Sequence, residues 1–272
     1  MTPMEVGTVE RGLEPLRAVL RDMGETVVCL SGGVDSALVT AVARDVLGDD
    51  AIAITALSPT LPREEAEIAR GLAERIGIRH LVVEAHELER EGYARNSGDR
   101  CYFCKTELFD LARAKANELG VRWIADGTIT DDLGDVRPGL KAAEEHAVRH
   151  PLVEAGMGKA QVRAAAKALG LEVWDKPSFA CLGSRFPVGT RVTLERVERV
   201  GLVESRLRAL GFRQFRARWH ELAGAPIVRL ELDPEELALA TKPGVREAIV
   251  EVCKEQGFRH VTLDLEGYAR RA

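Results

Sequence analysis

The sequence predicts an α/β protein: an open parallel sheet with helices on both faces, followed by a small C-terminal α/β domain. Through the first half of the 272 residues, short continuous apolar segments alternate with amphipathic segments of helical period. Repeated strand–helix units of this kind favour a parallel sheet with right-handed crossovers. After Pro187 the order changes to a long helix followed by strands and shorter helices. We therefore expect one domain over residues 1–176 and a second over residues 177–272.

Apolar periodicity predicts the individual elements. Continuous apolar runs are typical of strands buried on both faces, and they predict strands at Thr26–Leu30, Ala51–Leu57, His80–Glu84 and Val121–Ala125. Helical spacing predicts helices at Ser36–Leu47, Pro62–Ile76, Lys105–Leu119 and Lys159–Leu169. The stretch Asp126–Pro151 is rich in Gly, Asp and Pro and is expected to be an irregular functional loop. In the second domain, helices are expected at Thr193–Leu210, Pro234–Ala240 and Val245–Gln256, and strands at Arg213–Trp219, Ile227–Leu232 and Phe258–Leu263.

Composition and charge restrict the classes of partner. A hydrophobic content of 46% with 30% charged residues is typical of a soluble globular protein. The sequence has no apolar run long enough for a membrane span, and its first residues lack the basic region and apolar core of a secretory signal. We therefore expect a cytoplasmic protein. The net charge of −5 and the aromatic content of 5% argue against a nucleic acid partner.

A phosphate-binding loop is predicted at the sequence SGGVDS, which begins at Ser31 between a strand and a helix. Gly32 and Gly33 let the backbone approach an anion closely, and the N–H groups at the start of the next helix can hold phosphate. The hydroxyl groups of Ser31 and Ser36 add donors. Asp35 can bind the magnesium ion that bridges phosphate oxygens. The loop contains no lysine, so it is not the Walker A motif.

A second polar turn follows the fourth predicted strand. Asp126 and Thr128 flank a glycine where that strand ends, which suits contact with ATP or a metal ion. Asp131, Asp132 and Asp135 come soon after. Each aspartate alone could belong to a solvated acidic loop. Their position after a turn that faces the phosphate loop favours a functional cluster.

The five cysteines fall into two groups. Cys29 lies in an apolar run and Cys253 in a predicted helix, so both are expected to be small buried hydrophobes. Cys101 and Cys104 form a CxxC at the start of a helix, and Cys181 lies further along the chain. For these three cysteines, four interpretations compete. They are a structural zinc site without an evident fourth ligand, a redox pair, unrelated core cysteines, and an iron–sulfur cluster.

Charge and coordination chemistry favour the cluster. Arg100 and Lys105 flank the CxxC, which is not an apolar setting and which favours thiolate over thiol. Three thiolates on a [4Fe–4S] cluster leave one iron open, and that iron can bind an exogenous sulfide. An open coordination site is what a sulfur donor needs.

Two resemblances then point to a family. The SGGVDS loop resembles that of the PP-loop ATP pyrophosphatases, which have an adenine nucleotide alpha hydrolase-like fold and cleave ATP to AMP and pyrophosphate while adenylating a substrate oxygen. The stretches NSGDRCYFCKTELF, ADGTITDDLGDVRPG and KPSFACLGSRFP resemble the LarE family, the pyridinium-3,5-biscarboxylic acid mononucleotide sulfurtransferases. The second resemblance covers most of the chain and is densest from Ser31 to Pro187.

This resemblance implies a function and its parts. It implies an enzyme that uses ATP and Mg²⁺ to adenylate a carboxylate of the mononucleotide and convert it to a thiocarboxylate, on the route to the nickel-pincer cofactor of lactate racemase. Cys181 matches the sulfur-bearing nucleophile of the family, and Cys101 and Cys104 match its three-cysteine form with a [4Fe–4S] cluster. Ala56 matches the region that holds adenine, and we expect Lys105 to neutralise charge as pyrophosphate leaves. Sulfide or another sulfur donor and a homo-oligomer are also implied.

A basic patch in the second domain suits a phosphate monoester. Arg216 and Arg218 point to the same face of a predicted strand, and paired arginines form a fork for phosphate. Solvated surface arginines are the alternative. By resemblance, both arginines lie near the family's phosphate site, and Arg185 is a third candidate. Weaker candidates are Glu204 as a metal ligand, and His220 and Glu231.

Two other enzyme classes stay open. A PP-loop enzyme that thiolates tRNA also uses a CxxC with a third cysteine, although the acidic net charge argues against it. A PP-loop amide ligase that uses ammonia would not need the three cysteines, and a non-catalytic nucleotide-binding module would need neither chemistry. The chain departs from the family pattern at Ile129, where Asn is expected, and in residues 220–226, which look longer than usual.

Overall fold

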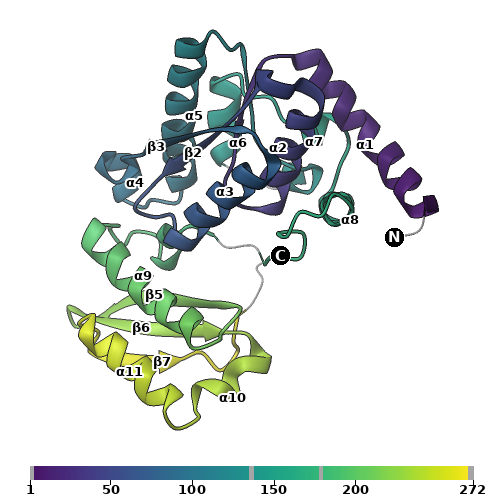
Figure 1. The fold of residues 1–272 in the computed structure, drawn as a ribbon. Helices are drawn as coiled ribbons and strands as arrows, with labels where there is room; N and C mark the ends of the chain where they lie inside the picture. Colours follow the sequence, from purple (N-terminus) through teal and green to yellow (C-terminus); the bar gives the residue numbers. More distant parts are fainter. Residues whose placement is uncertain (1–2, 135–137, 178–179, 269–272) are drawn as a thin grey trace. The chain divides into compact units, whose positions relative to one another are not determined.

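The structure, a computed structural model, describes residues 3–134, 138–177 and 180–268, with side chains from residue 12 onward. Among these, two compact units can be distinguished and are described separately. Unit 1 contains residues 3–87 and 99–177, and unit 2 contains residues 88–98 and 180–268. Residues 88–98 therefore interrupt unit 1 in the sequence, although their contacts group them with unit 2. Figure 1 labels the helices and strands of both units.

Unit 1 is built on the predicted parallel sheet. Its strands are β1 (Thr26–Cys29), β2 (Ala51–Leu57), β3 (Arg79–Glu84) and β4 (Trp123–Ala125). They pair in the order β3-β2-β1-β4, and all three pairings are parallel. Val27 of β1 lies opposite Ile52 of β2 and Ile124 of β4. The carboxyl ends of β1 and β4 are therefore neighbours at one edge of the sheet.

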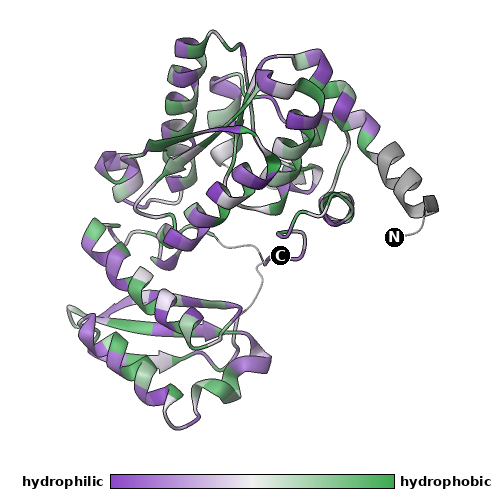
Figure 2. Cartoon of the chain, in the orientation of Figure 1, coloured by the Kyte–Doolittle hydropathy of each residue, from purple (hydrophilic) through white to green (hydrophobic). Residues whose placement is uncertain are grey.

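Helices cover both faces of this sheet. They are α1 (Pro3–Met23), α2 (Val34–Leu47), α3 (Arg63–Ile76), α5 (Arg100–Leu119), α6 (Pro138–Glu145), α7 (Pro151–Glu154) and α8 (Lys159–Ala168). Val28 of β1 packs into a core with α1, α2, α3 and α8. Its neighbours Val27 and Cys29 point to the other face and pack with Phe109 of α5 and Ala142 of α6. This alternation confirms the predicted fold class, and Figure 2 shows hydrophobic and hydrophilic residues alternating along the helices.

Unit 1 differs from the sequence analysis in three places. The N-terminal helix α1 was not predicted. Helix α5 begins at Arg100 rather than Lys105, so the predicted bound was wrong, whereas the CxxC does lie at the start of a helix as predicted. There the Tyr102 N–H donates to the Asp99 carbonyl at 2.9 Å. The segment expected to be irregular contains α6, whose Ala142 and Ala143 are buried in the core. Its glycine and proline allow this helix: Pro138 starts it, and at Gly139 a Cβ would lie 3.1 Å from Cγ of Lys105.

Unit 2 consists of a three-stranded sheet with helices on one face. Strands β5 (Phe215–Leu222) and β6 (Ala225–Leu232) are antiparallel, and β7 (His260–Leu263) runs parallel to β6. Its helices are α4 (Glu91–Ala94), α9 (Leu194–Ala209), α10 (Leu237–Ala240) and α11 (Val245–Glu255). Phe215, Ala217 and Trp219 of β5 are buried, and α9 packs on this strand and on α11. The alternate residues Arg216 and Arg218 are half-buried on the opposite face.

Cys29 and Cys253, the two cysteines outside the predicted sulfur site, agree with the sequence analysis. Cys29 is 6% exposed and Cys253 is fully buried, as predicted for small core residues. Burial raises the pKa of each of these thiols to about 12. Within the described part of the chain, no helix is long and apolar enough to cross a membrane.

The hairpin that joins β5 and β6 has a two-residue turn. Leu222 pairs with Ala225, so residues 220–226 form the strand ends and the turn. Ala223 and Gly224 in the turn have φ angles of 50° and 77°. Two positive φ values are the pattern of a type I′ turn, which Asn-Gly suits well.

We expect Ala223→Asn to stabilise unit 2 by roughly 0.5–1 kcal/mol, because Asn tolerates the left-handed region better than Ala does. The free energy of unfolding in urea measures this effect. Ala225→Asn serves as the control, since Ala225 lies in the strand rather than in the turn. Equal effects of the two substitutions would contradict the explanation.

Candidate active site

The phosphate loop, Ser31 to Ser36, connects β1 to α2. Gly32 has a φ of +78°, and a Cβ there would lie 2.9 Å from the Glu65 carbonyl oxygen, so the position requires glycine. Ser36 Oγ accepts a hydrogen bond from the Ser31 N–H at 3.1 Å and donates to the Gly33 carbonyl at 3.1 Å. Gly33 forms no side-chain cap on α2, so N–H groups of the first turn stay available for an anion.

The turn after β4 packs tightly on this loop. A Cβ at Gly127 would lie 2.6 Å from the Ser36 backbone nitrogen and 2.9 Å from its Cα. Asp126 and Thr128, the predicted contacts for ATP, are therefore held beside the start of α2. The sequence placed both turns at the carboxyl ends of strands, and the order of the sheet makes those strands neighbours.

Asp126 is a buried carboxylate with three donors. Its side chain is 4% exposed. Oδ1 accepts hydrogen bonds from His150 at 2.7 Å and from the Thr128 N–H at 3.0 Å, and Oδ2 lies 3.4 Å from Nζ of Lys105. Burial opposes ionisation, but the charge of Lys105 and the bonds from His150 and Thr128 outweigh it and hold the pKa of Asp126 well below its ordinary range.

Lys105 joins this carboxylate to the CxxC. Burial opposes its charge, yet Asp126, with smaller contributions from Cys29 and Cys104, raises the pKa of Lys105 overall. Cys101 is exposed and Cys104 is half-buried, and both lie in the first turn of α5 just before Lys105. One helix therefore carries two of the predicted sulfur ligands and a cation that reaches the edge of the phosphate loop.

Asp35, the predicted magnesium ligand, is paired with a lysine that the sequence analysis missed. Lys159, the first residue of α8, places Nζ 2.9 Å from Oδ1 and 2.7 Å from Oδ2 of Asp35. The backbone N–H of Lys159 donates to Asp131 at 2.5 Å. Asp132 accepts from the Ile129 N–H at 3.1 Å. The carboxylates of Asp131 and Asp132 thus accept hydrogen bonds from backbone N–H groups. Asp135 lies outside the described residues.

Lys176 is a second cation that the sequence did not identify. Its Nζ donates to the Gly32 carbonyl at 2.9 Å and to Glu65 at 2.6 Å. The lysine is 111 residues from Glu65 in the chain, and only the folded arrangement reveals the contact. It supports the back of the phosphate loop, on the side where Gly32 approaches α3.

The predicted adenine region lies at the end of β2. Ala56 is in the last part of that strand, where the residues become partly exposed. In the loop that follows, Ser58 and Thr60 both donate hydrogen bonds to Glu87, the second at 2.9 Å. Glu87 is 1% exposed, and its hydrogen bonds with Ser58 and Thr60 hold this loop in place.

In unit 2, Arg185 is fully buried beside Cys181. Its guanidinium forms a bidentate pair with Glu204, at 2.6 and 2.8 Å, and its remaining nitrogen donates to the carbonyls of Ala180 at 2.9 Å and Cys181 at 3.4 Å. Glu204 also accepts from the Ala217 N–H at 2.9 Å. These contacts give Arg185 a supporting position under the half-buried Cys181. Its expected contact with the substrate phosphate stays a prediction.

Arg216 and Arg218 form a crowded basic group on the face of the sheet opposite the helices. Arg218 donates to the Ser184 carbonyl at 2.7 Å and pairs with Glu231 at 2.9 Å. Arg216 donates to the Tyr268 hydroxyl at 3.0 Å and stacks on its ring at 4.8 Å. Burial lowers the pKa of Arg216, and the charges of Arg185 and Arg218 lower it further while Tyr268 opposes them. An anion here would relieve that repulsion.

The donor atoms for a metal are chemically suitable. Within the described residues, no three His, Cys, Asp or Glu side chains stand close enough together to hold a metal ion. Cys101 and Cys104 belong to unit 1 and Cys181 to unit 2. Partly accessible thiols and two cysteines within one helical turn suit an iron–sulfur cluster. The oxygens of Asp35 suit magnesium once Lys159 is displaced.

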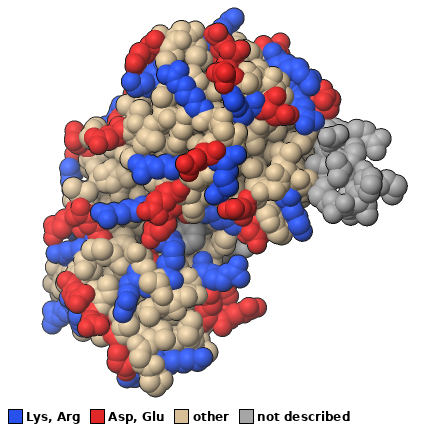
Figure 3. All heavy atoms as spheres, in the orientation of Figure 1, with Lys and Arg blue, Asp and Glu red and all other residues tan. Residues whose placement is uncertain are grey.

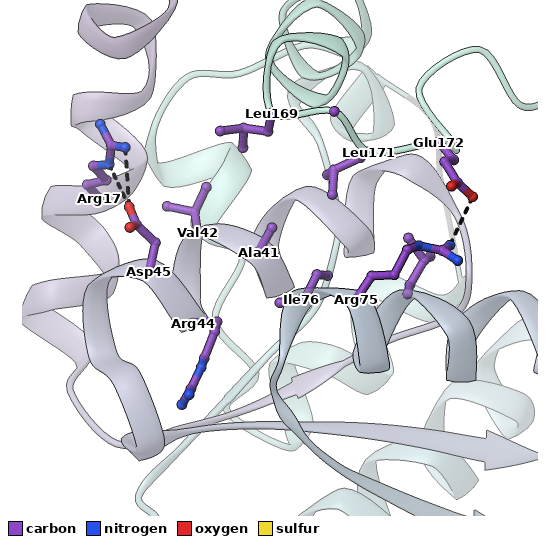
Figure 4. Close-up of a pocket in the computed structure, with 12 residues that line it drawn as sticks. Arg17, Ala41, Val42, Arg44, Asp45, Arg75, Ile76, Leu169, Leu171 and Glu172 are labelled. Atoms are coloured by element: carbon purple, nitrogen blue, oxygen red, sulfur yellow. Dashed lines mark hydrogen bonds and ion pairs between the residues drawn. The ribbon is translucent and has the colours of Figure 1, made fainter.

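A separate pocket in unit 1 lies away from these residues. Its volume is about 420 Å³, and α1, α2, α3 and the turn after α8 line it (Figure 4). Arg17 pairs there with Asp45 at 3.2 Å and Arg75 with Glu172 at 3.1 Å. No predicted site residue lines the described pocket. On the face shown in Figure 3, acidic and basic side chains are interspersed, in keeping with the modest net charge.

Gly127→Ala is expected to weaken ATP binding at least tenfold and to destabilise unit 1 by about 1–3 kcal/mol, because the added Cβ overlaps backbone atoms of Ser36. Calorimetric titration with ATP and urea unfolding measure the two effects. Gly134→Ala is the control, since a Cβ there meets nothing within 4 Å. ATP binding by Gly127→Ala at the level of the control would show that the close contact is unimportant.

Asp126→Asn is expected to change the dependence of stability on pH. The folded pKa of Asp126 is lowered, so its contribution is present above the unfolded pKa of about 4 and is lost as the pH falls below that value. The variant should be less stable than the wild type at pH 7, and its loss of stability below pH 4 should be shallower by up to about 1.4 kcal/mol per pH unit. Urea unfolding across pH 2–7 measures this, with the exposed Asp50→Asn as a control for net charge. Parallel curves for Asp126→Asn and wild type would contradict the assignment.

Comparisons with known proteins agree with this architecture. Residues 16–95, which include the phosphate loop, match the family model described as asparagine synthase. The chain is 44% identical over 260 residues to an uncharacterized protein of Synechocystis sp., covering 96% of each chain. It is 36% identical over 254 residues to the pyridinium-3,5-bisthiocarboxylic acid mononucleotide synthase of Lactiplantibacillus plantarum, covering 93% of this chain and 90% of that one.

A more distant similarity concerns sulfur transfer to RNA. A tRNA-specific 2-thiouridylase of Azorhizobium caulinodans is 33% identical over 190 residues, which covers 56% of this chain and 48% of that enzyme. The match to the mononucleotide synthase extends through both units, whereas the thiouridylase matches about half of the chain. The protein is an enzyme of the PP-loop ATP pyrophosphatase class and belongs to the family of the pyridinium-3,5-bisthiocarboxylic acid mononucleotide synthases.

Proposed function

We propose that the protein is an ATP-dependent sulfurtransferase that converts carboxylates of pyridinium-3,5-biscarboxylic acid mononucleotide to thiocarboxylates. The observation that carries this proposal is the position of α5. Its first turn bears Cys101 and Cys104, and Lys105 on the same helix reaches Asp126 beside the phosphate loop. Thiol chemistry and ATP chemistry are thereby linked within one rigid element.

The first half-reaction is adenylation. The phosphate loop binds the triphosphate through N–H groups of α2 and the hydroxyls of Ser31 and Ser36. Asp35, which pairs with Lys159, would hold the magnesium ion, and Lys159 would then face the phosphates. A carboxylate oxygen of the substrate then attacks the α-phosphorus, and the bond to the β,γ-pyrophosphate breaks. Lys105 neutralises part of the charge that develops.

The second half-reaction transfers sulfur. The Cys181 thiolate attacks the carbonyl carbon of the acyl adenylate, and AMP leaves with the electrons of the carbon–oxygen bond. If the sulfur is that of Cys181 itself, loss of the Cys181 Cα proton to a base then breaks the Cβ–Sγ bond, so the thiocarboxylate departs and dehydroalanine remains. A [4Fe–4S] cluster held by Cys101, Cys104 and Cys181 would supply an open iron site for an external sulfide. With such a site Cys181 would keep its sulfur, and the enzyme would turn over many times.

The substrate's phosphate is assigned to the basic face of unit 2. Arg216 and Arg218 provide the fork, and Arg185 supports the Cys181 segment from beneath. A second cycle of adenylation and sulfur transfer then converts the other carboxylate of the substrate. The resemblance further implies that the product enters the nickel-pincer cofactor of lactate racemase and that the enzyme is a homo-oligomer. These two points rest on the family alone.

A tRNA substrate is the second candidate function, favoured by the partial similarity to a 2-thiouridylase. The net charge of −5 and the match of both units to the mononucleotide synthase argue for the small substrate. A gel-shift titration with total tRNA separates the two. Sub-micromolar binding of tRNA would favour the RNA substrate. An amide ligase would keep its full activity in Cys181→Ala.

Cys181→Ala is expected to lower thiocarboxylate formation at least a hundredfold while leaving ATP–pyrophosphate exchange with the mononucleotide within a few fold of wild type. Mass spectrometry of the product and exchange of labelled pyrophosphate measure the two half-reactions. Cys253→Ala, in the core of α11, is the control. Thiocarboxylate formation by Cys181→Ala at the rate of the control would remove the proposed nucleophile.

Anaerobic purification, followed by iron analysis of the same proteins, tests for the cluster. Wild type should carry about four iron atoms per chain, and Cys104→Ala should lose them. Absence of iron together with loss of one sulfur from Cys181 per turnover would show that the cysteine is consumed instead.

A further inference from the structure

Asn96 is a buried polar residue that the proposed reaction does not use. It precedes the CxxC, in the segment 88–98 that packs with unit 2. The residue is 1% exposed and has a φ of +56°. Asn is one of the few residues other than glycine that tolerates this left-handed conformation. Both the backbone and the burial therefore favour Asn at this position.

The side chain of Asn96 forms a clasp on the segment that follows Cys181. Its amide nitrogen donates to the carbonyls of Pro187 at 2.8 Å and Thr190 at 3.1 Å, and lies 3.4 Å from that of Phe186. The backbone carbonyl of Asn96 accepts a hydrogen bond from the Gly189 N–H at 2.8 Å. Several main-chain groups of one loop thus converge on one residue. An amide donates to carbonyls, whereas a carboxylate would repel them.

Neighbouring contacts reinforce the same pairing of segments. The Val192 N–H donates to the Ala94 carbonyl at 2.8 Å. Arg191 forms a bidentate pair with Glu91, with both distances 2.7 Å. This ion pair is exposed, so it contributes little. The buried amide of Asn96 is the contact whose loss leaves polar groups without partners.

The contact between Asn96 and the segment after Cys181 lies close in sequence to the CxxC on one side and to Cys181 on the other. Cys101 follows Asn96 by five residues, and Phe186 follows Cys181 by five residues. Five residues of extended chain span at most about 18 Å. A fixed point shared by both segments therefore limits how far either thiol-bearing stretch can move from the other.

We propose that Asn96 is a positioning residue for sulfur transfer: its amide ties the chain that enters the CxxC to the chain that leaves Cys181. This role rests on the proposed function, because it presumes that the three cysteines act together. It assigns Asn96 no contact with substrate. Removing the amide lengthens the tether between the two thiol-bearing segments and leaves the phosphate loop intact.

Thiol cross-linking tests the clasp without relying on activity. The reduced, chelator-treated protein is exposed to a short bismaleimide, and peptide mass spectrometry measures links between Cys181 and either cysteine of the CxxC. Asn96→Gly keeps the positive φ and removes the amide, and Asn96→Asp keeps the size and removes the donor. Both should lower the cross-link yield at least fivefold. The exposed neighbour Ser97→Ala is the matched control and should link as the wild type does.

Each result discriminates. ATP affinity within twofold of wild type shows that unit 1 of a variant is folded, and an unchanged near-ultraviolet spectrum shows the same for unit 2. Wild-type yields in folded Asn96→Gly and Asn96→Asp would overturn the role of Asn96 while leaving the proposed function in place. Failure of the wild type itself to link Cys181 to the CxxC would overturn the joint action of the cysteines, and with it the role of Asn96 and the proposed cluster, but not sulfur transfer by Cys181 alone.

Discussion

The candidate site depends on the close packing of the turn after β4 against the first turn of α2. Gly127 has no room for a Cβ beside Ser36, and this contact brings a buried carboxylate to the edge of the phosphate loop. The parallel sheet makes the contact possible, because β1 and β4 are neighbours whose carboxyl ends share an edge. The position of the N–H groups at the start of α2 and that of the Asp126 network are therefore consequences of one arrangement.

Charge balance around this edge is maintained by long-range pairs. Asp126 pairs with Lys105 and is hydrogen-bonded to His150, Asp35 pairs with Lys159, and Glu65 pairs with Lys176. These partners come from α5, from α8 and from the segments that flank the helices. Asp35 and Glu65 each pair with a lysine. Since a magnesium–nucleotide complex brings both a cation for Asp35 and anions for a lysine, binding can exchange partners without leaving a charge unpaired.

Local pattern was sufficient for the sheet and for most helices, because apolar runs and glycine caps report directly on burial and on chain reversal. Ala51–Leu57 was predicted to the residue, and Gly77 ends α3 in the left-handed conformation. Helix α6 was missed because Gly139 and Pro138 read as loop residues, although the glycine is there to let two helices approach. His150, Lys159 and Lys176 could not be found from sequence alone, since their partners lie 24 to 144 residues away.

The aspartates after β4 show how similar residues acquire different roles from their surroundings. Asp126 is buried, paired with Lys105 and hydrogen-bonded to His150 and the Thr128 N–H, so its ionised form is strongly favoured and can act electrostatically. Asp131 is exposed and accepts from the backbone at the start of α8, and Asp132 accepts from the backbone of Ile129. By holding the Lys159 backbone, Asp131 also positions the side chain that pairs with Asp35. Asp131 thus acts on the phosphate loop through Lys159. The spacing of the aspartates in the sequence does not predict this indirect role.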